Sequence, residues 1–123
     1  MTELRLDFAD DRRAFKPGES VEGRVSWSVS GASSAEVRLF WYTRGKGTED
    51  VGLVDTVAFP NPQTTDQRTF RFALPEGPYS FSGKLISIMW AIELILEPGP
   101  SVERREIVMS PSGREVVVAH ESA

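Results

Sequence analysis

The chain has 123 residues, of which 40% are hydrophobic and 26% are charged, and its formal net charge is −4. This length fits one domain with a single core, residues 1–123 with the core at about 3–119, and the negative charge disfavours nucleic acid or an anionic membrane surface as a partner. Cysteine is absent, which excludes disulfides, thiolate nucleophiles and cysteine metal sites.

The N-terminal segment, MTELRLDFADDRR, lacks a basic start followed by an apolar stretch. We therefore expect no secretory signal and a cytoplasmic protein. The longest apolar run, residues 85–96, is interrupted by Ser87 and Glu93. It is too short to cross a hydrocarbon layer of about 30 Å as a helix, so we expect no membrane insertion.

Alternation of apolar and polar residues defines the first predicted strands. Leu4, Leu6 and Phe8 alternate with charged residues, and residues 21–29 then place Val, Gly, Val, Trp and Val at every second position. A period of two is expected where one face of a strand meets a core and the other meets water. Between these runs, residues 16–19 have the Pro-Gly order of a tight turn.

The next predicted strand has apolar side chains on both faces. Val37, Leu39 and Trp41 share one face, and Phe40 and Tyr42 lie on the other. Two arrangements are open: either the strand is buried on both sides, or Phe40 and Tyr42 form an exposed aromatic patch. An exposed patch of this kind would mark an interface.

Residues 84–97, KLISIMWAIELILE, form an ambiguous segment, because the spacing of the apolar residues also fits a helix. Its even positions from 86 to 96 are apolar without interruption, whereas its odd positions include Ser87 and Glu93. The segment is also rich in β-branched and aromatic residues, and Gly83 and Pro98 flank it. These features predict one long strand.

Three further predicted strands complete the pattern at residues 69–74, 101–109 and 113–119. Alternation breaks near Glu106 and Ile107, which predicts a β-bulge there. Seven or eight antiparallel strands without a helix predict an all-β, immunoglobulin-like β-sandwich. We expect Trp27 and Trp90 to point into its core.

Three stretches in order resemble the N-terminal domain of the arrestin-like superfamily, with the α-arrestin and bacterial sporulation-control types as the closest. They are a Phe-x-Pro-Gly-Glu-x-Val-x-Gly-x-Val start at residues 15–25, an apolar strand leading into the charged hairpin TRGKGTED at 43–50, and a Leu-Pro…Pro-x-Ser-x-x-Gly-Lys step at 74–84 before the long strand. The resemblance spans about residues 3–109. It implies a non-enzymatic adaptor or scaffold that binds a protein partner through hairpin loops and sheet surfaces.

The chain departs from the arrestin pattern in two ways that bear on function. Arrestins have two sandwiches in tandem, whereas we expect one here, and the first strand, ELRLDF, has none of the paired lysines of phosphate recognition. By position, the hairpin resembles the loop that arrestins insert into a partner. We expect Arg44 and Lys46 to donate hydrogen bonds to acidic partner groups, with Phe40 and Tyr42 in the same interface. An exposed sheet face or edge also predicts a homodimer.

No residue arrangement predicts a catalytic, cofactor or metal site. His120, the single histidine, lies in a predicted C-terminal tail, and Ser80 and Ser82 lie in a Gly/Pro-rich turn without a nearby base. The acidic residues of 49–55 lack the alternating ligand order of a calcium loop. We therefore expect no enzyme, no cofactor and no metal.

Two other classes of function stay open. A small-ligand or carbohydrate-binding β-sandwich would show a surface row of aromatic rings. An enzyme with a carboxylate pair would hold two acids in a deep pocket.

Overall fold

The computed structural model describes residues 2–45, 49–83, 85–112 and 116–117, the last two by their backbone only. Lys46, Lys84 and His120 therefore lie outside the described residues. The elements are β1 (Glu3–Phe8), the 3-10 helix η1 (Ala9–Asp11), β2 (Ala14–Phe15), β3 (Ser20–Ser28), β4 (Ser34–Gly45), β5 (Val51–Phe59), β6 (Thr65–Ala73), β7 (Phe81–Ser82), β8 (Ile86–Glu97), β9 (Ser101–Met109) and β10 (Val116–Val117). Because η1 is the one helical segment in these ranges, no helix of the described chain could span a bilayer.

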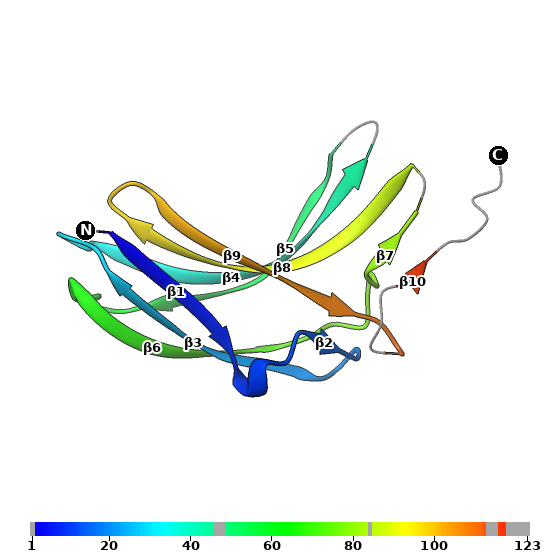
Figure 1. Ribbon diagram of the computed structural model, residues 1–123, viewed down its shortest axis with the longest axis horizontal. Coiled ribbons are helices and arrows are strands. Elements are labelled where there is room, and N and C mark those ends of the chain that lie inside the picture. The colour runs from blue at the N-terminus through cyan, green and yellow to red at the C-terminus, as the bar shows by residue number, and fades with distance from the viewer. Residues whose placement is uncertain (1, 46–48, 84, 113–115, 118–123) are drawn as a thin grey trace.

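The strands form two stacked layers (Figure 1). The small sheet has the order β1-β3-β6, and the large sheet has the order β10-β7-β8-β4-β5, with β9 following β7 along the edge of β8 that faces away from β4. The predicted all-β sandwich is confirmed. However, β2 pairs with the end of β9, and β10 pairs with β7, in parallel. These pairs make the sheet mixed rather than purely antiparallel, because each joins segments that are distant in sequence instead of a hairpin.

The ambiguous segment is a strand, as predicted. β8 pairs antiparallel with β4 along its whole length, from Ser34 opposite Glu97 to Gly45 opposite Ile86. Its even-numbered side chains from Trp90 onward are buried in the core. The strand is stable in this position because it has a hydrogen-bonded neighbour on each side.

The predicted bulge near Glu106 and Ile107 is wrong. β9 pairs with β8 without a register shift from Ser101 to Ile107. Alternation appeared broken because Glu103 and Arg105 occupy positions that face the same side as Ile107, where they are ion-paired with each other. The real register shift lies in the pairing of β4 with β5, between Leu39 and Phe40.

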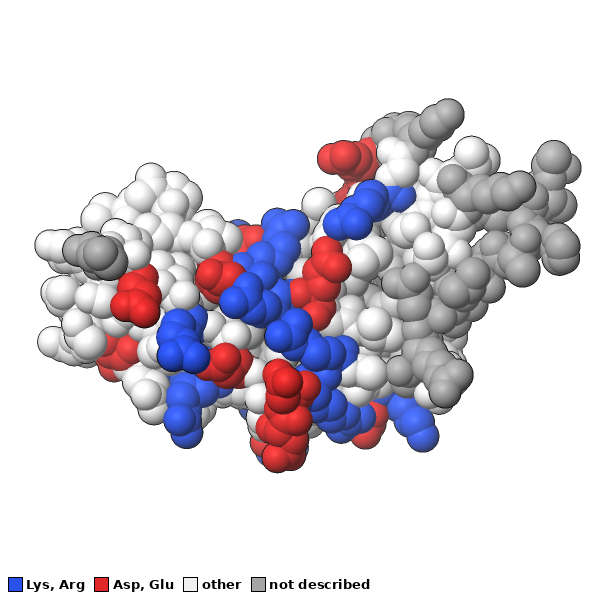
Figure 2. Space-filling view, viewed as in Figure 1, with Lys and Arg blue, Asp and Glu red and all other residues white. Residues whose placement is uncertain are grey.

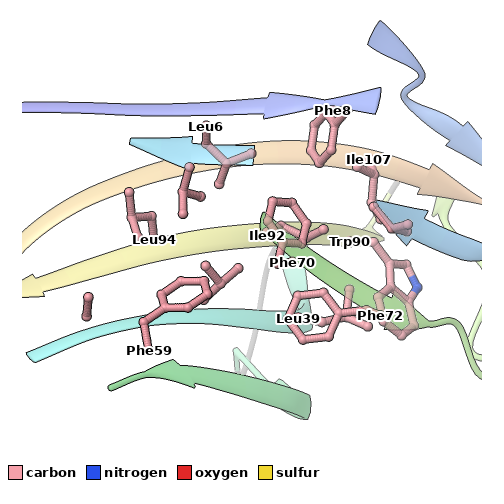
Figure 3. Packing of buried hydrophobic residues seen from close by; sticks show 14 of the residues in the cluster. Leu6, Phe8, Leu39, Phe59, Phe70, Phe72, Trp90, Ile92, Leu94 and Ile107 are labelled. Carbon is pink, nitrogen blue, oxygen red and sulfur yellow. The ribbon is translucent and has the colours of Figure 1, made fainter. Parts of the chain in front are cut away.

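The core lies between the two layers (Figure 3). Trp27 and Trp90 are buried in it, as predicted. Each indole N–H donates to a loop carbonyl: Trp27 to Gln63 at 2.8 Å and Trp90 to Pro78 at 2.7 Å. These bonds satisfy the one polar atom of each buried ring and attach a loop to the core.

Gly23 lets two aromatic rings of the small sheet meet. In the register of β1, β3 and β6, Gly23 lies between Phe8 and Phe70, whose ring centroids are 6.5 Å apart in an edge-to-face arrangement. A Cβ atom at Gly23 would collide with the Asp7 carbonyl oxygen and with the Phe70 ring. A glycine is therefore required here by close packing rather than by a turn.

Ser80 attaches the Gly/Pro-rich segment before β7 to the end of β9. Its side chain is buried, its N–H donates to the Met109 carbonyl at 2.8 Å, and its hydroxyl oxygen accepts the Met109 N–H at 3.0 Å. Ser80 is thus a buried structural residue that holds this irregular segment against the end of β9.

Candidate functional site

The outer faces of the two sheets differ in chemical character. Outward positions of the small sheet are polar, and Arg71 on β6 pairs with Glu22 on β3 at 3.5 Å, with both side chains well exposed. The outer face of the large sheet instead combines aromatic, aliphatic and charged side chains from β4, β5, β8 and β9. This contrast identifies the large sheet as the face with an unusual surface.

Phe40 lies on the outer face but is only 6% exposed. The side chain that covers it is Arg104 on β9, whose guanidinium carbon lies 5.0 Å from the centre of the Phe40 ring and 5.3 Å from that of Tyr42. The two rings are 6.0 Å apart. Of the two arrangements considered above, burial on both sides therefore holds for Phe40, whereas Tyr42 is half-buried.

Glu93 on β8 fixes the position of Arg104. Its carboxylate accepts a hydrogen bond from Arg104 Nε at 2.9 Å and lies 2.8 Å from Nη2, and the Glu93 side chain is 14% exposed. A guanidinium held by a largely buried carboxylate loses little further freedom when something packs against it. Arg104, Glu93 and Phe40 therefore form a pre-organised unit on the sheet surface.

A second polar group surrounds Tyr42. The Tyr42 hydroxyl donates to Glu106 Oε1 at 2.6 Å, and Arg44 Nη2 lies 3.2 Å from both the Glu106 carboxylate and the Tyr42 oxygen. Burial raises the pKa of Tyr42 above its usual value of 10.0, and the adjacent Glu106 carboxylate raises it further. Arg44, which we expect to meet acidic partner groups, is thus already ion-paired, although its side chain is 63% exposed.

A hollow of about 460 Å³ lies between β9 and the start of β5. Phe40, Tyr42 and Arg44 all line it, so the structure brings together three of the four predicted site residues. The fourth, Lys46, lies outside the described residues. On the β5 side the lining includes Val51 and Leu53, which are 69% and 59% exposed.

Sequence reasoning missed Arg38, Glu93, Arg104, Val51 and Leu53 as lining residues. One signal was available for Glu93, which interrupts an otherwise apolar strand. No comparable signal marks Arg104, because its position depends on β9 lying beside β8, and a local sequence pattern does not predict strand order.

Positive and negative side chains interleave across the face seen in Figure 2 rather than forming a patch of one sign.

A wider hollow of about 700 Å³ lies at Gly23 and Phe70. Its charged lining includes the exposed pair of Glu22 and Arg71. The described residues contain no group of three His, Cys, Asp or Glu side chains placed to hold a metal ion. The surface around Phe40 and Tyr42 is therefore the better candidate for a functional site.

No model of a known protein family matches the sequence, and no curated protein sequence matches it. Among solved structures, the chain is similar to Spo0M, a sporulation control protein from Bacillus subtilis, with a TM-score of 0.64 and 18% identity over 89% of this chain. The match spans 49% of Spo0M, so this chain corresponds to about half the length of that protein.

Two other solved structures are more distant. A superoxide reductase (neelaredoxin) from Ignicoccus hospitalis has a TM-score of 0.47 and 16% identity, over 89% of this chain and 82% of that one. A β-glucosidase from Listeria innocua has a TM-score of 0.43 and 16% identity, over 94% of this chain and 16% of that one. Neither likeness is strong enough to carry an argument. The fold of Spo0M is arrestin-like, and the chain therefore has the arrestin-like fold that its sequence resembles.

Proposed function

We propose that the protein is a non-catalytic, arrestin-like interaction module that binds a protein partner through the outer face of its large sheet. The observation that carries the proposal is the packing of Arg104 over Phe40 and Tyr42, beside the exposed side chains of Val51 and Leu53. Aromatic residues and arginine are enriched among the residues that dominate binding energy in protein interfaces. Side chains that are already held in place cost less entropy to bind.

Three observations favour this function over the two alternatives. A carbohydrate site would use exposed aromatic rings, but Trp27, Trp90 and Phe40 are buried. A carboxylate-pair enzyme would hold two acids in a deep pocket, but Glu49 and Asp50 in the lining of this hollow are exposed, and Glu93 is paired with Arg104. Spo0M is a sporulation control protein, and a regulatory role of that kind supports a partner-binding function without catalysis.

The test compares two arginines in similar settings on opposite faces. Arg44 pairs with Glu106 at 3.2 Å and Arg71 pairs with Glu22 at 3.5 Å, and their side chains are 63% and 70% exposed. Tagged protein captures partners from an extract of its native host, and mass spectrometry identifies them. The recombinant partner is then titrated against purified variants.

We expect Arg44→Glu to weaken binding by about tenfold or more and Arg71→Glu to change it by less than about twofold. The same change of charge on both faces controls for long-range electrostatic effects. Equal weakening by the two variants, or weakening by Arg71→Glu alone, would show that the partner does not use the proposed face.

A further inference from the structure

The open edge of β5 differs from the open edges of the small sheet, which are β1 and β6. β1 and β6 each pair with β3 alone, and they carry Arg5 and Arg71 respectively. β5 pairs with β4 alone, and its sequence, VGLVDTVAF, contains neither lysine nor arginine. Basic residues on an edge strand oppose the addition of another strand, so β5 lacks a protection that β1 and β6 have.

Apolar side chains lie along this edge. Val51, Leu53 and Val54 are 69%, 59% and 37% exposed. The register shift opposite Leu39 and Phe40 leaves regular pairing with β4 on both sides of Val54. A strand of nine residues offers room for several backbone hydrogen bonds to a new neighbour.

Negative charge is concentrated on and just before β5. Glu49, Asp50 and Asp55 are exposed, and none of them forms an ion pair with a described lysine or arginine. Two copies of β5 side by side would bring these carboxylates close to their equivalents, which is unfavourable. A segment with basic residues would instead be attracted to the edge.

We propose that β5 adds a strand from a partner protein, an extended segment in which apolar residues alternate with basic ones. This inference rests on the proposed function and specifies how the partner binds. The partner backbone pairs with the open edge of β5, and its apolar side chains pack on Val51 and Leu53, which also line the hollow. A basic side chain of the same segment lies near Asp55.

Three synthetic peptides of nine residues, the length of β5, test the mode of binding. In the first, valine alternates with lysine. The second has glutamate in place of each lysine, and the third is the lysine peptide with alternate backbone nitrogens methylated. Fluorescence anisotropy of labelled peptides measures affinity. We expect the lysine peptide to bind and the other two to bind at least about tenfold more weakly.

Each comparison has a result that would overturn the proposal. Equal binding of the methylated peptide would mean that backbone pairing is not involved. Equal binding of the glutamate peptide would mean that the acidic residues at β5 do not select a basic partner segment. If none of the three peptides binds, while Arg44→Glu still weakens binding of the partner protein, strand addition is wrong and the proposed function is unaffected.

Variants locate the peptide on the molecule. Asp55→Lys places a lysine on the β5 edge, and Glu3→Lys makes the same change on the exposed edge strand β1. We expect Asp55→Lys to weaken binding of the lysine peptide by at least about tenfold and Glu3→Lys by less than about twofold. Equal losses of affinity in the two variants would mean that the peptide responds only to the net charge of the protein and does not bind at β5.

Sedimentation tests whether a second copy of the chain occupies the edge instead. A wild-type dimer that Leu53→Lys converts to a monomer would show this.

Discussion

The Tyr42 hydroxyl donates a hydrogen bond of 2.6 Å to Glu106, although the two residues are 64 positions apart in the sequence. They lie on β4 and β9, which are not neighbours but pair with opposite sides of β8. Glu106 is opposite Ala91, and Phe40 is opposite the same alanine on the other side. The small Ala91 side chain leaves space for larger groups to meet across β8.

Replacing Glu106 by glutamine should lower the pKa of Tyr42. Burial is the main cause of the raised pKa and will persist, but the negative charge beside the phenol will be lost. Ultraviolet titration in a Tyr79→Phe background, which leaves one tyrosine, measures this value. Arg44→Gln is the control and should raise the pKa of Tyr42, because Arg44 lowers it. A lower Tyr42 pKa in both variants would contradict the opposite effects assigned to Glu106 and Arg44.

The same raised pKa makes stability depend on alkaline pH. The folded protein holds the Tyr42 proton more tightly than the unfolded chain, so the contribution to stability is present below the ordinary pKa of 10.0. It is lost as pH rises through the higher folded value. Urea unfolding from pH 9 upward should therefore show a smaller alkaline loss of stability in Tyr42→Phe than in the wild type.

Asp66 should make the protein sensitive to acid. Hydrogen bonds from Arg68, and from the backbone N–H groups of Gln63 and Gln67, lower the pKa of Asp66 from 3.8 to about 2. The stability this carboxylate contributes is present above pH 4 and is lost as pH falls toward 2. Asp66→Asn should therefore lose less stability than the wild type between pH 5 and pH 2.5 in urea unfolding.

Arg68→Gln is the matched test of the cause. Because Arg68 gives the largest contribution to the lowered pKa, its removal should flatten the acid dependence as Asp66→Asn does, and the double variant should add little. An acid loss of stability that is unchanged in both variants would mean that other carboxylates control it. Arg68 also donates to the carbonyl oxygens of Pro60 and Asn61, so its loss should increase exchange of amide hydrogens in that loop.

Ser80→Ala should destabilise the fold by about 1–3 kcal/mol, because the Met109 N–H would be left buried without its hydroxyl partner. Ser82→Ala, on the neighbouring β7, should cost less than about 0.5 kcal/mol. Chemical denaturation of both variants gives the comparison. A near-neutral Ser80→Ala would show that the buried N–H finds another acceptor or a water molecule.

Gly23→Ala should be destabilising by about 1–3 kcal/mol, since the new methyl group would be forced against the Asp7 carbonyl and the Phe70 ring. Gly77 is the control, because a Cβ atom there would meet nothing within 4 Å and its φ angle is not positive. Gly77→Ala should leave the unfolding free energy within about 0.5 kcal/mol of the wild type. Thermal and urea unfolding measure both variants.

Much of the fold could be predicted from the sequence, because alternation is a local property of a strand. The period of two was sufficient to predict the all-β sandwich, the long strand β8 and the inward direction of Trp27 and Trp90. Each of these depends on residues that are close together in the chain and share one face.

Alternation gave a wrong prediction in β9, where polar residues occupy positions on the core-facing side of the strand. Glu103 and Arg105 face inward beside the core, and their mutual ion pair makes polar residues tolerable there. A pattern of hydrophobicity has no means of anticipating that pairing, so it predicted a bulge in β9. The actual irregularity lies in the pairing of β5 with β4, where Asp55 is opposite Leu39 and Leu53 is opposite Phe40, so Val54 has no partner.

The candidate site was decided by tertiary structure. The strand pattern predicts Phe40 and Tyr42 as interface residues, and the hairpin that follows predicts Arg44. Arg104, which covers the two rings, comes instead from β9, on the far side of β8. Strand order depends on how distant segments pair, and this is a balance of backbone hydrogen bonding and core packing over the whole chain. The sequence by itself determined which faces of the strands are apolar. Only the assembled sheet decided which charges lie over them.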